Sequence, residues 1–70
     1  MRRLTFRQLR TFESVARNLS FSRAAAELHM SQPAVSMQVR VLETIAGQPL
    51  TEQIGKKIYL TEAGREMYLA

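Results

Sequence analysis

The sequence predicts a mainly α-helical domain, and three observations support that prediction. Apolar residues recur at spacings of three and four through most of the chain before Gly47, as they do on one face of a helix. A serine or threonine stands directly before each of these stretches, where its side-chain oxygen can cap a helix. Period-two alternation is confined to a short stretch around Gly55, which is typical of a single β-hairpin.

The first helix is expected to begin after Thr5 and to run to about Asn18. Thr5 and Gln8 have the spacing of a capping box, and Leu4 and Leu9 stand where a hydrophobic staple forms. The apolar stripe expected to face the core consists of Leu9, Phe12, Val15, Ala16 and Leu19.

The next two helices are expected to form a helix-turn-helix. Ser20 caps a short helix, and Ser31 caps a longer one that extends from about Gln32 to Ala46. Gly47 stands where a left-handed residue would end the longer helix. The apolar pattern of the short helix is formed by Phe21, Ala24, Ala25 and Leu28. Because only His29 and Met30 separate the short helix from the Ser31 cap, the turn between the helices is tight.

The longer helix has two very different sides at about 100° per residue. The side expected to pack consists of Val35, Val39, Leu42 and Ala46. The side expected to remain free consists of Pro33, Ser36, Met37, Arg40 and Thr44.

A hairpin and a last helix are predicted after Gly47. The turn is expected at Gly55-Lys56-Lys57, followed by alternation of Ile58 and Leu60 with Tyr59. Thr61 would cap a helix with Ala63, Met67 and Ala70 on one face. The predicted architecture is a winged helix-turn-helix over residues 1–60, with a three-helix core and a two-stranded wing. Residues 61–70 would begin a linker helix.

Composition excludes several classes of function. Seventy residues form one small domain that buries only about 60% of its unfolded surface. With no cysteine and one histidine, neither a disulfide, a metal site nor a cofactor is expected. No apolar stretch approaches the ~20 residues that cross a bilayer, so a cytoplasmic protein without membrane contact is expected. The net charge of +4 favours a polyanionic partner.

No catalytic constellation is present in the sequence, so an enzyme is not expected. The chain lacks aspartate, cysteine and a glycine-rich phosphate loop. Its six glutamates are scattered singly and are interpreted as surface residues. Glu43 is a candidate for a contact between helices, although its partner cannot be identified from the sequence.

The free side of the longer helix has the residue types that recognise DNA. Gln32 can pair with adenine, Ser36 with bases or phosphates, and Arg40 with guanine or phosphate. An ordinary solvated helix face is the alternative interpretation. Met37 is the apolar member of this side and could touch a thymine methyl or pack against a partner.

Other candidate contacts lie at helix starts and in the hairpin. Ser20, Ser22 and Ser31 stand where free N–H groups and partial positive charge could hold a phosphate, although plain capping explains them equally. Lys56 and Lys57 could reach a flanking minor groove or its phosphates, or serve solubility alone. His29 is interpreted as a turn residue.

Several sequence elements, in the same order and spacing, carry a family resemblance. They are Phe6-Arg7-Gln8-Leu9-Arg10-Thr11-Phe12, Val15-Ala16, Ser20-Phe21-Ser22-Arg23-Ala24-Ala25, Leu28–Ser36, Leu42-Glu43, Gly47, Leu50 and Leu60-Thr61-Glu62-Ala63-Gly64. Through them the whole chain resembles the N-terminal domain of the LysR-type transcriptional regulators. The segment Ser31–Val39 looks most like regulators of carbon-fixation (Calvin cycle) operons.

The resemblance implies sequence-specific binding of double-stranded DNA at a pseudo-palindromic operator. It implies base and phosphate contacts from the positions of Gln32, Pro33, Ala34, Ser36 and Met37. It also implies a homodimer or higher homo-oligomer, formed through the last helix, and an inducer-binding domain that the 70 residues do not include.

The chain departs from the family pattern at three positions. Met37 stands where arginine is common, and Thr51 and Gln53 replace an expected phenylalanine and arginine before the wing. Two alternatives to DNA binding follow from the residues alone. A winged helix used for protein-protein contact is one, and a basic helix bound to a membrane is the other.

Overall fold

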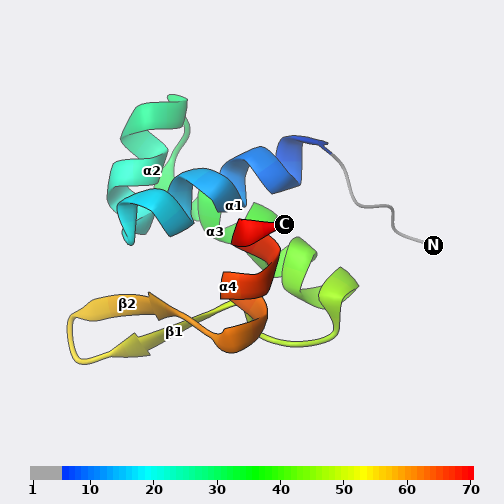
Figure 1. Ribbon diagram of the computed structural model, residues 1–70. Helices are drawn as coiled ribbons and strands as arrows, with labels where there is room; N and C mark the ends of the chain where they lie inside the picture. Colours follow the sequence, from blue (N-terminus) through cyan, green and yellow to red (C-terminus); the bar gives the residue numbers. More distant parts are fainter. Residues whose placement is uncertain (1–5) are drawn as a thin grey trace.

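The computed structural model describes residues 6–70, which form four helices and a two-stranded antiparallel sheet (Figure 1). In chain order the elements are α1 (Phe6–Asn18), α2 (Phe21–Leu28), α3 (Gln32–Ala46), β1 (Thr51–Ile54), β2 (Lys57–Leu60) and α4 (Glu62–Leu69). The predicted winged helix-turn-helix architecture is confirmed, including both ends of α3. The capping box and staple predicted at Leu4 and Thr5 lie outside the described residues. None of the helices in residues 6–70 has the length and apolar character needed to cross a bilayer.

Side-chain caps begin three of the helices. The Ser20 hydroxyl accepts a hydrogen bond from the backbone N–H of Arg23 at 3.1 Å, and the Ser31 hydroxyl accepts one from Ala34 at 3.2 Å. Thr61 does the same for α4. Gly47 ends α3 with a φ of 78°, and its N–H donates to the Glu43 carbonyl at 2.8 Å. These caps satisfy backbone groups that have no partner inside a helix.

The two short connections between helices each contain a residue with a left-handed backbone. Leu19 has a φ of 49° and His29 a φ of 56°, a region that costs most L-residues about 1–2 kcal/mol. His29 is the turn residue predicted from the sequence. The prediction that Leu19 belongs to the buried stripe of α1 is wrong, since its side chain is 47% exposed. Because α1 ends at Asn18, the left-handed residue after it no longer shares the helix face.

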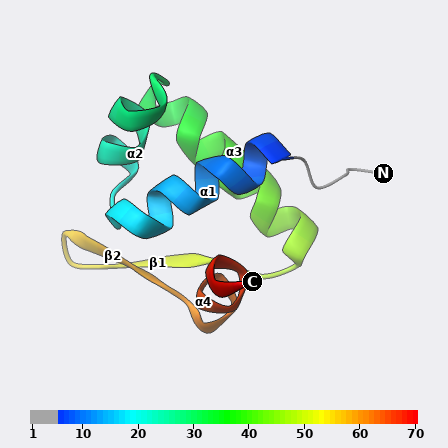
Figure 2. The same cartoon turned by 45° about the horizontal axis from the view of Figure 1, so that its top comes forward.

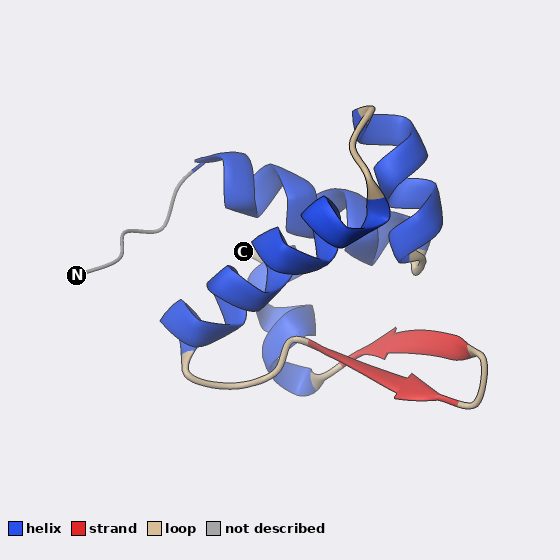
Figure 3. Ribbon diagram, turned by 180° about the vertical axis from the view of Figure 1, so that it is seen from behind, coloured by secondary structure: helices blue, strands red, loops and turns tan. Residues whose placement is uncertain are grey.

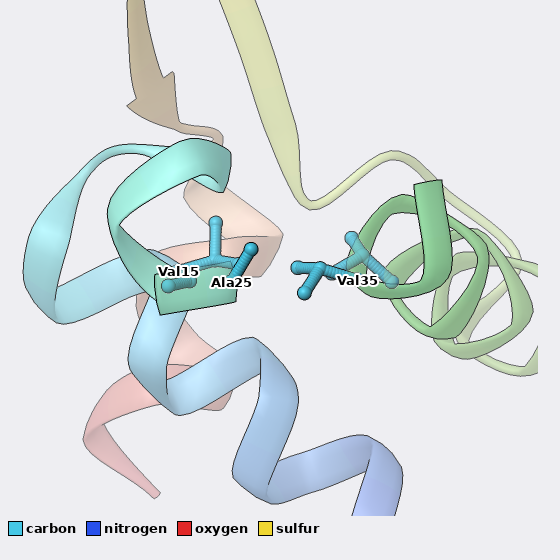
Figure 4. Close-up of a cluster of buried hydrophobic side chains, with 5 residues drawn as sticks. Val15, Ala25 and Val35 are labelled. Atoms are coloured by element: carbon cyan, nitrogen blue, oxygen red, sulfur yellow. The ribbon is translucent and has the colours of Figure 1, made fainter. Parts of the chain in front are cut away.

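The first of two core clusters holds the helix-turn-helix together. Val15, Ala24, Ala25, Val35 and Val39 are its buried members, with Phe21, Met30 and Ile58 partly buried against them. Figure 4 shows side chains of α1, α2 and α3 directed at one another, labelled at Val15, Ala25 and Val35. This cluster buries the N-terminal half of the predicted packing side of α3.

The second cluster attaches α4 and the base of the hairpin. Its buried members are Phe12, Ala16, Leu42 and Leu50. From α4, Ala63, Met67 and Tyr68 pack against it. Leu42 and Leu50 have no exposed surface. The C-terminal half of α3 therefore packs against both α1 and the chain that leads into the hairpin.

The hairpin extends away from the helices as a wing (Figure 2). Thr51 pairs with Leu60 at its base, and Ile54 pairs with Lys57 at its tip. The turn predicted at residues 55–57 is one residue too long, because Lys57 is the first residue of β2. A two-residue loop suffices to reverse the chain, since Gly55 adopts a left-handed φ of 64°.

Replacing Leu42 with alanine is expected to reduce the free energy of unfolding by about 2–5 kcal/mol, because the change leaves a cavity between α1, α3 and Leu50. In a domain of this size each 1 kcal/mol lowers the melting temperature by roughly 4–8 °C. Thermal unfolding followed by circular dichroism measures the shift. Met37→Ala, on the same helix but 57% exposed, is the control. An unchanged melting temperature for Leu42→Ala would contradict the assigned packing side of α3.

Candidate nucleic-acid interface

The N-terminal half of α3 presents an uncovered side opposite the core. Gln32, Pro33, Met37 and Arg40 are exposed there, with Met37 at 57%. Ser36 lies on the same stretch but is half-buried, as is Ala34. Figure 3 views the molecule from the side on which α3 lies in front of α1, with α2 above it and the hairpin beside it. The structure therefore brings the predicted contact residues of α3 onto one accessible helix face.

The starts of α2 and α3 supply hydroxyl groups beside free backbone donors. Ser22 and Ser31 are exposed, and Ser20 is half-buried. Ser20 and Ser31 use their oxygens as cap acceptors, as described above. A hydroxyl that accepts a backbone bond keeps its own hydrogen and can donate it to a phosphate oxygen. The capping role and a phosphate contact are therefore compatible at these two residues.

The wing carries exposed cations at its tip. Lys56 lies in the turn, and Lys57 begins β2. Tyr59 is 42% exposed and Ile54 61% exposed, whereas Ile58 and Leu60 alternate with them as half-buried residues that face the helices. The hairpin thus packs on the helices through Ile58 and Leu60 and carries exposed lysines at its tip, which is its part farthest from the core.

An ion-pair network joins α1 to α2 on the surface. The Arg17 guanidinium donates to Glu13 at 2.8 Å and to both carboxylate oxygens of Glu27, one of them at 3.0 Å. Asn18 also donates to Glu27, at 3.1 Å, and to the carbonyl of Ser14, at 2.8 Å. The network joins the C-terminal end of α2 to the C-terminal end of α1 at the surface.

Sequence reasoning missed this network, because it treated the glutamates as isolated surface residues. The spacing of Glu13 and Arg17 is that of a helical i,i+4 pair and could have identified one half of it. Nothing in the sequence relates Glu27 to Arg17, because the pair depends on how α2 packs on α1.

The network lowers the pKa of Glu27 to about 2. The hydrogen bonds from Arg17 are the largest cause and the one from Asn18 is the next, while desolvation acts in the opposite direction. The same bonds, from Glu27 first and then from Glu13, raise the pKa of Arg17 above its usual range. Both charges are therefore held over the whole neutral range.

Comparison with known proteins identifies relatives with the same arrangement. The family model described as bacterial regulatory helix-turn-helix protein, lysR family, matches residues 6–65. A RuBisCO operon transcriptional regulator of Allochromatium vinosum is 62% identical over 65 residues, which cover 93% of this chain and 22% of that protein. A RuBisCO operon transcriptional regulator of Acidithiobacillus ferrooxidans is 57% identical over 67 residues, covering 96% of this chain and 22% of that protein. The chain thus spans about a fifth of the length of these relatives.

Solved structures with the same fold include complexes with DNA. A CbnR DBD–DNA complex superposes with a TM-score of 0.88 at 38% identity, covering 94% of this chain and 76% of that one. A BenM DBD/catB site 1 DNA complex superposes with a TM-score of 0.89 at 33% identity, covering 94% of this chain and 73% of that one. The helices and wing described above therefore have the arrangement found in these proteins.

Replacing Glu27 with glutamine is expected to destabilise the fold at neutral pH and to matter less in acid. The pKa of Glu27 is lowered on folding, from an ordinary 4.5 to about 2. Its stabilising contribution is therefore present above about pH 4.5 and is lost as the pH falls toward 2. Urea unfolding of both proteins at a series of pH values measures the difference. Glu52→Gln, an exposed glutamate of β1, is the control, and a difference independent of pH would contradict the network's role.

Proposed function

Because the chain belongs to the lysR family of bacterial regulatory helix-turn-helix proteins, we propose that it is the DNA-binding part of a transcriptional regulator. It binds double-stranded DNA in a sequence-dependent way, with α3 in the major groove and the wing, residues 55–57, on the flanking minor groove or backbone. It acts by binding rather than by catalysis, in the cytoplasm, where bacterial DNA lies.

The observation that carries this proposal is the uncovered N-terminal half of α3, since the opposite side of the same helix is buried at Val35 and Val39. An α-helix fits the major groove, and side chains near its N-terminus reach base edges. The superposition on two domains in complex with DNA supports DNA binding by this fold. A winged helix used only for protein contact is not favoured, because the exposed residues of this half include Gln32 and Arg40.

Each proposed contact residue of α3 has a role that its chemistry allows. Gln32 and Ser36 contact base edges, and Arg40 contacts guanine or a phosphate. Pro33, Ala34 and Met37 form the apolar part of the surface, which can lie against thymine methyl groups. Ala34 and Ser36 are half-buried, so they reach only a groove that fits closely around the helix.

Phosphate contacts flank these base contacts. Ser20, Ser22 and Ser31 lie at or beside the first turns of α2 and α3, where partial positive charge favours an anion. Lys56 and Lys57 hold the wing against the neighbouring backbone by charge. Together these groups fix the register of α3 along the duplex.

The genes under control are proposed to be those of carbon fixation. Relatives that are 62% and 57% identical are named RuBisCO operon transcriptional regulators, and their similarity extends over nearly the whole chain. A relative with a similar α3 would bind a related operator, since α3 supplies the proposed base contacts.

Two copies are proposed to bind a pseudo-palindromic operator as a homodimer, or within a higher homo-oligomer, through α4. An open, mostly apolar groove lies between α1, the end of α3 and α4, lined in part by Leu9, Ala46, Met67 and Ala70. A linker helix that extends α4, which begins at Glu62, would continue this apolar surface into the rest of a longer protein. The domain boundary at residues 60 and 61 stays a prediction.

Replacing Lys56 and Lys57 together with alanine is expected to weaken binding to all duplexes alike. Each lost phosphate contact lowers the slope of log affinity against log salt by about 0.9. Fluorescence anisotropy with a mixed-sequence duplex at several salt concentrations measures that slope. Glu52→Gln on the same hairpin is the matched control for surface change. An unaltered slope after loss of both lysines would remove the wing from the proposed interface.

Gln32→Ala and Ser36→Ala are expected to reduce sequence preference rather than overall affinity. Each lost base contact costs about 1–3 kcal/mol on the preferred duplex and little on a random one. The preferred duplex is first obtained by selection from random sequences with the wild-type chain. Competition between the preferred and random duplexes then gives the ratio of affinities. Equal losses on both would show that these side chains only position α3.

A further inference from the structure

Leu50 is a fixed point in the chain between α3 and the wing. Its side chain has no exposed surface and packs with Phe12, Ala16 and Leu42. Its backbone N–H and carbonyl are both hydrogen-bonded, one toward α3 and the other toward the start of α4. The first pair of the hairpin, Thr51 and Leu60, follows directly. Leu50 is therefore the point from which the wing departs.

A carboxylate of α3 holds the N–H side of Leu50. Oε2 of Glu43 accepts the hydrogen bond from the Leu50 N–H at 2.8 Å, seven residues along the chain. A hydrogen bond to an ionised acceptor is about twice as strong as one between neutral groups. The backbone carbonyl of Glu43 also accepts the hydrogen bond from the Gly47 N–H at the end of α3. Glu43 thus ties the last turn of the recognition helix to the first residue before the wing.

Thr61 and Gly64 hold the other side. The Thr61 N–H donates to the Leu50 carbonyl at 3.1 Å, and its hydroxyl donates to the Pro49 carbonyl at 2.8 Å. The same hydroxyl oxygen accepts the Gly64 N–H at 3.0 Å. A Cβ added at Gly64 would lie 1.9 Å from the Leu50 carbonyl oxygen, so α4 can approach this closely only with glycine there.

The length of the hairpin magnifies any movement at this point. The tip lies beyond Ile54, which is four residues after Leu50, or about 13 Å of extended strand at roughly 3.3 Å per residue. A rotation of about 10° at the base would shift the far end of β1 by about 2.3 Å. A charge-assisted hydrogen bond to phosphate requires a separation of about 2.7–2.9 Å, so this shift would break it.

We propose that Glu43 and Thr61 are positioning residues that clamp Leu50 and thereby set the direction of the wing relative to α3. They need not touch DNA. The clamp keeps the exposed side of α3 and the lysines at the wing tip at a constant distance from each other. This inference rests on the proposed DNA binding, and in particular on phosphate contacts from Lys56 and Lys57.

A double-mutant cycle between the clamp and the wing lysines tests the proposal. The 70-residue chain is titrated with a mixed-sequence duplex at several salt concentrations, with and without the substitutions Lys56→Ala and Lys57→Ala. In the wild-type background the two changes should lower the salt slope by about 1.8, or about 0.9 for each lysine. In a Glu43→Ala background they should lower it by less than half as much, because the tip is no longer held against the phosphates.

Glu43→Gln is the matched control, because glutamine loses the charge but keeps an oxygen that can accept from the Leu50 N–H. In the Glu43→Gln background the two lysine substitutions should still lower the salt slope by most of the wild-type amount; we call this lowering the lysine effect. The comparison with Glu43→Ala therefore separates the positioning of the wing from the removal of a negative charge near DNA. A full lysine effect in the Glu43→Ala background would overturn the proposal, as would an equal loss in both Glu43 variants.

The Thr61 side of the clamp provides a second, independent pair of variants should Glu43→Ala fail to fold. Thr61→Val removes the hydroxyl that bonds Pro49, and Thr61→Ser keeps it. Valine should diminish the lysine effect and serine should preserve it, whereas equal lysine effects in the two would overturn the proposal. Failure of the proposed DNA binding gives a different result, since the lysine changes would then leave the wild-type slope unaltered.

Discussion

The close packing of α2 against both α1 and α3 is the constraint on which the rest of the structure depends. Ala24 has no exposed surface and Ala25 only 6%, and both belong to the cluster formed with Val15 and Val35. Alanine side chains let helix backbones approach closely, and a larger residue would need several neighbours to move. Because this packing buries one side of α3, it also decides which side of α3 remains free for a partner.

A second cluster determines where the wing and α4 lie. Leu42 of α3 and Leu50 before β1 are both fully buried in it, so one half of α3 anchors the helix-turn-helix and the other half anchors the hairpin. The proposed DNA-binding surface therefore depends on two core clusters, and both α1 and α3 contribute residues to each of them. Interior packing resists small displacements, and the spacing between α3 and the wing inherits that rigidity.

Local chemistry made the helix limits predictable. Ser20, Ser31 and Thr61 cap helices as their positions indicate, and Gly47 ends α3 in the left-handed region. The predictions from sequence were wrong at the ends of two elements, where the residue pattern continues past the point at which the element ends or begins. Leu19 fits the stripe of α1 by spacing but lies beyond the last helical residue, and Lys57 resembles a turn residue but pairs with Ile54. Each error concerns one residue at the end of an element, where spacing gives no information about backbone direction.

The sequence by itself determined the helices, the hairpin, the packing side of α3 and the residue types on its free side, because caps and periodicity depend on neighbours along the chain. Only the tertiary structure decided which distant groups meet. Glu27 pairs with Arg17, and Glu43 with the N–H of Leu50. The need for glycine at position 64 is likewise visible only where α4 meets Leu50. These contacts join segments whose relative placement results from the burial of two clusters, and no pattern in either segment alone specifies its partner.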